Sequence, residues 1–213
     1  MSGWPSCSGL PDRAACRALA LGFALLPGAA NAHSSAPGIE GFYLGVLHPL
    51  TSLAQVLAFL ALGLVFGQRW PRNFALGWAV FAAGCVLGIV LGQMGVPMDA
   101  AEPVLLALAL AAGVLAALWP SGPAIPAIAL AGMAGIVIGL VSTPDPGPPR
   151  SVAVTLTGSF AGAVALLLNA AAGVGWLREN ARAVWVGIGL RVLAAWVAAI
   201  SALLLALALS GPR

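Results

Sequence analysis

Charge is what this sequence has least of. Only 7% of its 213 residues are charged, none is lysine, and 61% are hydrophobic. A soluble domain carries about 25% charged and about 45–50% apolar residues. The chain therefore cannot cover a water-exposed surface, which excludes a soluble enzyme. Its high apolar content also excludes a disordered chain, because disordered chains are poor in such residues.

The few charges give no sign of a nucleic-acid partner. All nine basic residues are arginine, against six acidic residues, and they are scattered along the chain without a basic run. The pI near 9.2 therefore does not indicate nucleic-acid binding. The partner we expect is the lipid bilayer, in which arginines orient the helices.

Motifs of the common catalytic classes are missing as well. The sequence has no Walker loop and no cysteine pair for zinc or haem. With only two histidines, no Ser–His–Asp set is visible. We therefore expect a protein that is not an enzyme, and we interpret Cys85, inside an apolar run, as a small buried hydrophobic residue.

The first 32 residues have the arrangement of a secretory signal peptide. Arg13 and Arg17 precede a short apolar run at 18–26, and an A-x-A cleavage site ends at Ala32. The run is too short to span a bilayer, which takes about 20 residues. We predict cleavage after Ala32, so that the mature domain, 33–213, begins with His33; the alternative is an uncleaved anchor.

Six apolar runs follow, each near the length that crosses the hydrocarbon core. Each must be helical, because lipid offers no water to open backbone groups. The expected spans lie near 47–66, 74–93, 103–119, 124–142, 151–176 and 183–209. We predict an all-α fold: an integral membrane bundle of six transmembrane helices after a cleavable signal peptide.

The arginines also predict an orientation. The loops expected in the cytoplasm hold Arg69, Arg72, Arg178 and Arg182, while the outer segments hold Arg150 and Arg213. This bias agrees with the positive-inside rule. We predict a multi-pass protein of the bacterial inner (cytoplasmic) membrane with both mature termini in the periplasm.

Small residues recur at the spacing that lets helices pack closely in lipid. The GxxxG pairs are Gly63/Gly67, Gly84/Gly88, Gly135/Gly139 and Gly158/Gly162, and Gly92 extends the second pair. They predict either packing inside one bundle, which we favour, or a homo-oligomer.

Polar residues inside a membrane are expensive and need an explanation. His48 and Gln55 would share one face of a straight helix, about 10 Å apart, too far for one metal ion to bridge without other helices or local unwinding. Asn169 and Arg191 lie at matching depths, which predicts either a hydrogen-bonded pair or an Arg191 that extends to the inner interface.

The outer face offers candidate metal ligands. His33 at the mature N-terminus would carry both an α-amino group and an imidazole, and His48 and Glu102 map to the same side. Imidazole suits Ni, Cu and Zn. The competing interpretation is that outer loops are simply where polar residues must lie.

The segment GFYLGVLHPLTSLAQVLAFLALGL (41–64) resembles the HupE/UreJ family. The family's first span opens with a segment like G-x-x-HPxxGxDHLLAMLAVGL, following a cleaved signal and a histidine. The closing stretch GLRVLAAWVAAISALLLA also looks like the family's last helix, and Pro97 and Glu102 resemble its stretch before the third span. The matching first-span residues are Gly45, His48, Pro49, Leu53, Leu57, Ala58, Leu60, Gly63 and Leu64.

The resemblance implies a nickel or cobalt permease, or a metal-handling accessory protein for urease or hydrogenase maturation. The divalent ion would be a transported substrate and not a permanently bound cofactor. Ala54 and Gln55 stand where the family has Asp and His, and the fourth span lacks the family's histidine-rich stretch. The alternative is therefore a non-transporting membrane scaffold or partner protein that kept the fold and lost the ligands.

Overall fold

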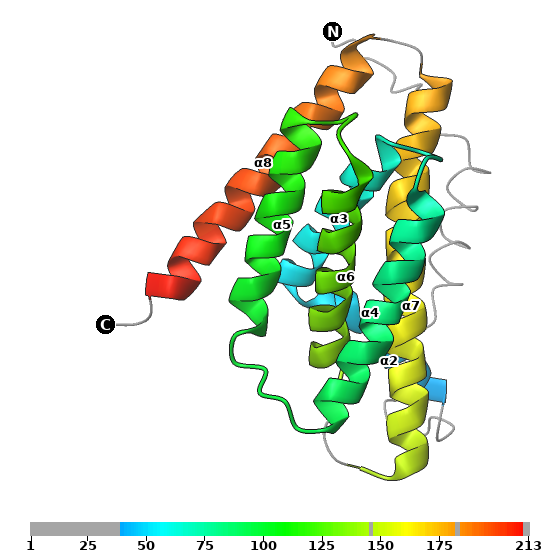
Figure 1. Ribbon diagram of the computed structural model, residues 1–213. Coiled ribbons are helices and arrows are strands. Elements are labelled where there is room, and N and C mark those ends of the chain that lie inside the picture. Colours follow the sequence, from blue (N-terminus) through cyan, green and yellow to red (C-terminus); the bar gives the residue numbers. More distant parts are fainter. Residues whose placement is uncertain (1–38, 145–146, 182–183, 211–213) are drawn as a thin grey trace, which may run out of the picture. The chain divides into compact units, whose positions relative to one another are not determined.

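A computed structural model describes residues 39–144, 147–181 and 184–210 of the chain. The described residues are almost entirely helical (Figure 1). The helices are α2 (Ile39–Thr51), α3 (Leu53–Gly67), α4 (Phe74–Gln93), α5 (Ala101–Leu118), α6 (Ala124–Val141), α7 (Pro149–Asn180) and α8 (Val184–Ser210). The predicted leader and His33 lie outside the described residues, as do Arg182 and Arg213.

Five helices, α4 to α8, are long and apolar enough to cross a membrane. The pair α2 and α3 passes the same test together, and counts as a sixth span if it is taken as one broken span. The predicted all-α membrane bundle is confirmed. The first span, expected as one helix near 47–66, is instead two helices that meet at an angle of 77°.

Two local features break the first span at Ser52. Pro49, inside α2, has no N–H and so removes one bond of the helical ladder. The Thr51 hydroxyl then donates to the carbonyl of His48 at 2.7 Å. That carbonyl is the acceptor that the Ser52 N–H would need for α2 to continue. Ser52 accordingly adopts an extended conformation (φ −104°, ψ 123°), and α3 begins one residue later.

Helix α3 is the centre of the bundle. It packs against α5 and α7 and also contacts α6 and α8. Twelve of its fifteen residues are buried, among them Leu62, Val65 and Phe66. A helix that is apolar on every side belongs in such a position. The shorter α3 is therefore enclosed by the longer spans and not by lipid.

Glycines set the closest contacts between helices. A Cβ on Gly88 of α4 would collide with the Ile136 carbonyl oxygen of α6, and one on Gly158 of α7 with that of Phe42 in α2. A Cβ on any of the remaining predicted GxxxG glycines would also come too close to atoms of a neighbouring segment: backbone carbonyls for some, side chains of α7 for Gly63 and Gly67, and Thr143 after α6 for Gly92. Their use for packing within the bundle is confirmed.

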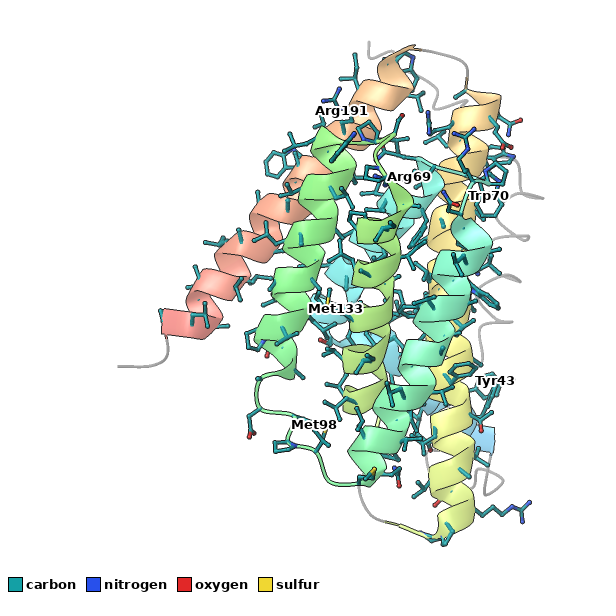
Figure 2. The ribbon with its side chains drawn as sticks, viewed as in Figure 1. Tyr43, Arg69, Trp70, Met98, Met133 and Arg191 are labelled. Atoms are coloured by element: carbon teal, nitrogen blue, oxygen red, sulfur yellow. The ribbon has the colours of Figure 1, made fainter. Side chains whose placement is uncertain are left out.

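Several arginines gather at one end of the bundle, which we call the arginine end. Figure 2 shows Arg69 and Arg191 there, and Met98 at the opposite end. Arg178 of α7 joins them, since its Nη1 donates to the carbonyl of Gln68, just after α3. The charge bias predicted from the loops is thus present in the fold, with Arg150 in the first turn of α7.

A matched pair of glycine substitutions tests the packing. In Gly139→Ala the new Cβ collides with backbone atoms of Cys85, whereas in Gly173→Ala it meets nothing within 4 Å. We expect Gly139→Ala to lower the free energy of unfolding by about 1–3 kcal/mol. Gly173→Ala should be neutral or stabilising by up to about 1 kcal/mol. Thermal unfolding in detergent checks this, and equal effects would contradict it.

Candidate functional site

His48 lies in the last turn of α2 and is partly buried. Its Nε2 is 3.2 Å from the carbonyl oxygen of Val141, the last residue of α6. A carbonyl can only accept, so Nε2 carries the proton in this contact, and Nδ1 of the neutral ring keeps its lone pair. Metal-binding histidines are commonly oriented by such a bond to a backbone carbonyl. His48 is therefore arranged to offer Nδ1 as a ligand.

Gln55 lies in the first turn of α3 and is only 3% exposed. Its Oε1 has no hydrogen-bond partner in the structure. The bend at Ser52 places it on a different helix from His48, so the predicted shared face of one straight helix is wrong. The physical reason is the loss of the helical ladder at Pro49 and Thr51. The local unwinding that a shared site would need is what the structure shows.

Two buried hydroxyls near the break also lack partners. These are Oγ of Ser159, in α7, and Oγ1 of Thr143, just after α6. The Ser159 nitrogen lies 2.8 Å from where a Cβ on Gly45 would stand, so Ser159 is packed against α2 one turn before His48. A buried polar atom left unpaired costs about 1–3 kcal/mol. We call His48, Gln55, Thr143 and Ser159 the polar set of the broken span.

The break also leaves backbone carbonyl groups without hydrogen-bond partners. Helix α2 ends at Thr51, so its last carbonyls have no partner within the helix apart from the His48 carbonyl that Thr51 takes. Helix α3 begins at Leu53 without a side-chain cap from Ser52. In broken membrane helices, free carbonyls and carboxyl ends coordinate cations. The α2 side of the break is therefore the side that suits a cation.

A cavity of about 680 Å³ lies at the opposite end to the arginines. It is lined by residues from the end of α4, the loop after it, the segment between α6 and α7, and the start of α7, including Gln93, Met98, Thr143 and Val152. Figure 2 shows Met98 at this end. Thr143 is the one lining residue that also belongs to the polar set, and none of the lining residues comes from α2 or α3.

Two of the three predicted metal ligands, His48 and Glu102, lie among the described residues. Glu102 is exposed in the first turn of α5. No group of three His, Cys, Asp or Glu that could hold a metal exists among those residues. His33 lies outside them, so the ligand set of His33, His48 and Glu102 stays a prediction.

The predicted bond between Asn169 and Arg191 is wrong. Asn169 Nδ2 donates to the Ala165 carbonyl of its own helix at 2.8 Å. Arg191 Nε donates to the Ala117 carbonyl of α5 at 2.8 Å, next to the helix end. Each side chain finds a nearby backbone acceptor, and α7 and α8 make little contact. The structure thus agrees with the alternative, an Arg191 that extends toward the interface.

Sequence reasoning missed several polar groups that the fold buries, among them the side chains of Gln68, Ser142 and Ser201. The hydroxyl of Thr143 is buried as well, although the residue falls in an expected loop and nothing in the sequence marks it. Gln68 follows the first span and is 6% exposed, with Nε2 donating to the Ala116 carbonyl at 3.3 Å. A glutamine just after a span gives only a weak signal, because most such residues face water.

Comparison with known proteins gives one match. The family model described as HupE / UreJ protein matches residues 21–205. The matched segment includes the broken span and ends within α8. No curated protein and no solved structure matches the chain.

Two buried glutamines allow a matched test of the unpaired oxygen. Gln55→Met removes a buried oxygen that has no partner, whereas Gln68→Met removes a hydrogen bond to Ala116. We expect Gln55→Met to raise the free energy of unfolding by about 1 kcal/mol and Gln68→Met to lower it by a similar amount. Unfolding of both variants in detergent gives the comparison. A loss of stability in Gln55→Met would show that Oε1 is paired in the native protein.

Proposed function

Because the chain belongs to the HupE/UreJ family, we propose that it carries nickel or cobalt ions across the bacterial inner membrane for urease or hydrogenase maturation. Its family and its membrane-spanning helices give it a membrane accessory or permease-like role. The ion is the transported substrate, and no permanently bound cofactor is needed.

The broken first span is the observation that carries this proposal. Transporters place substrate sites at interrupted helices near the middle of the membrane, where irregular backbone lines a cavity. Here the interruption lies between His48, with Nδ1 free to bind, and Gln55, with an unpaired oxygen. An ion entering through the cavity near Met98 would meet Thr143, which lines that cavity. It would then have to pass to His48, whose Nε2 lies 3.2 Å from the Val141 carbonyl oxygen, and to the open carbonyls of α2.

The ligand atoms of the polar set suit weak, transient binding of a metal ion. The polar set offers one imidazole and neutral oxygens, without a carboxylate. Ala54, where the family has Asp, is 2% exposed and offers only a methyl group. Conduction requires ligands strong enough to admit an ion and weak enough to release it. The remaining set is consistent with passage of an ion and does not fit a tightly held one.

Arg191 does not obstruct such a path. A cation close to the route would repel a divalent ion. Arg191 contacts α5 through Ala117, and it lines a shallow groove between α5 and α8 with Leu118 and Val192. The polar set belongs to α2, α3, α7 and the end of α6. The arginine is therefore associated with a different pair of helices.

We place the arginine end in the cytoplasm, following the positive-inside rule. Alkaline phosphatase, which is active only outside the cytoplasm, should then be active when fused after Arg213. It should be inactive when inserted in the loop between α5 and α6, at Ser121. Activity at Ser121 and none after Arg213 would reverse the orientation.

Uptake of radiolabelled nickel tests the transport itself. Cells that lack their own nickel importers would express the wild type, His48→Ala or Asn169→Ala, at equal levels in the membrane. We expect His48→Ala to abolish uptake, because it removes the one nitrogen ligand of the polar set. Asn169→Ala should retain uptake, since this exposed side chain bonds only its own helix.

Two results would contradict the proposal. No uptake of nickel or cobalt above the empty vector, with wild-type protein present, would exclude the permease. It would leave the alternative of a membrane scaffold or partner protein, which pull-downs with urease or hydrogenase maturation factors would address. Uptake that His48→Ala leaves unchanged would remove the broken span from the pathway.

A further inference from the structure

A second cavity, of about 280 Å³, lies at the arginine end. It is formed by the loop after α3 and the loop after α5. Its polar lining residues include Arg69, Arg72, Asn73 and Ser121, and none of its lining residues is acidic. Its volume is just below the range for ligand pockets, about 300–1,000 Å³. The cavity therefore suits a small, hydrogen-bond-accepting group.

Arg69 is held rigidly at this cavity. Its Nη1 donates to the Val65 carbonyl of α3 at 2.9 Å, and its Nη2 to the Trp119 carbonyl after α5 at 2.7 Å. A guanidinium has five N–H donors, so these two bonds leave others free. Its Nε is buried without a partner. A fixed cation with unused donors is well suited to an anion, because little side-chain entropy remains to be lost.

Arg72 supplies a second guanidinium. Its side chain is exposed, in the loop just before α4. Arginine binds phosphate oxygens through parallel N–H bonds, which gives such contacts both strength and direction. Two arginines in one small cavity, beside the amide of Asn73 and the hydroxyl of Ser121, match the acceptor-only surface of a phosphate group.

The helix ends add to the positive potential. Helix α4 begins after Asn73 and α6 after Pro123, and neither residue makes a side-chain cap bond. The two helices pack side by side with their N-termini at the same end, since Gly84 lies at Gly132 and Gly92 at Thr143. Helix N-termini carry a partial positive charge and attract anions.

The carboxyl ends of α3 and α5, which also lie at the arginine end, do not cancel the positive potential of the cavity. These ends carry a partial negative charge. Arg69 binds the Val65 carbonyl, Gln68 that of Ala116 and Arg191 that of Ala117. Burial also lowers the pKa of Arg69, which stays protonated because a guanidinium is not deprotonated in proteins. Arg69 is half-buried, and a charge partly removed from water is stabilised by an anionic partner.

We propose that this cavity binds an anionic phosphate group, supplied either by the headgroup of an anionic lipid or by free inorganic phosphate. The arginine pair and the N-termini of α4 and α6 would hold its oxygens. The inference is independent of metal transport, because it uses none of the polar set of the broken span.

The test uses the full-length protein and two arginine variants. Arg72→Gln removes the exposed guanidinium of the cavity. Arg150→Gln removes an equally exposed one in the first turn of α7, at the opposite end. Native mass spectrometry would follow retention of phosphatidylglycerol against phosphatidylcholine. Thermal unfolding in phosphatidylcholine nanodiscs would follow the response to inorganic phosphate.

We expect wild type and Arg150→Gln to retain the anion and Arg72→Gln to bind it about tenfold more weakly, for one charged hydrogen bond lost. A difference confined to phosphatidylglycerol identifies a lipid headgroup, and one confined to inorganic phosphate identifies the free anion. Equal binding by the two variants, or no binding of either probe by the wild type, would overturn the proposal.

Discussion

The contact between α2 and α7 determines much of the rest of the structure. Lipid provides no hydrophobic force between helices, so close backbone packing must hold them together. Gly45 lets α2 approach the Thr155 carbonyl, and Gly158 lets α7 approach that of Phe42. With α2 fixed on α7 and α3 buried in the centre, the chain has to turn between them. The 77° bend at Ser52, where Pro49 and Thr51 interrupt the helical ladder, makes this turn. Its open backbone groups are tolerated because protein surrounds them.

The same bend explains why polar atoms are buried where none would be expected. Gln55 and Ser159 are almost fully buried, and each has an oxygen without a partner. A bundle under selection for stability alone would replace both with apolar residues, since unpaired buried oxygens lower stability. Sites that bind a substrate carry such costs, because the substrate satisfies the groups that the fold leaves open. The unpaired oxygens of Gln55 and Ser159 lower the stability of the fold, and this cost is the physical argument for an ion pathway at the broken span.

The sequence predicted the spans well and the break poorly, for reasons that lie in the bilayer. Hydrocarbon thickness sets the length of an apolar run, so the run at 74–93 coincides with α4. The run at 47–66 is equally continuous, and a proline such as Pro49 is tolerated in membrane helices, so nothing in it marks Ser52 as the end of a helix. The depth of a residue in the membrane also does not say toward which neighbouring helix its side chain points. Asn169 and Arg191 therefore matched in depth while contacting different elements.

The two proposed sites are linked by electrostatics. On the proposed route, a divalent ion that has passed the broken span would leave past the arginine end, where Arg69, Arg72 and the N-termini of α4 and α6 raise the electrostatic potential. Like charges in a poorly screened environment repel strongly, and this repulsion would slow release. A phosphate group bound between the arginines would offset part of that charge while leaving the bonds of Arg69 to the carbonyls of Val65 and Trp119 in place. An anion at this end would thus lower the exit barrier for a cation without taking part in its coordination.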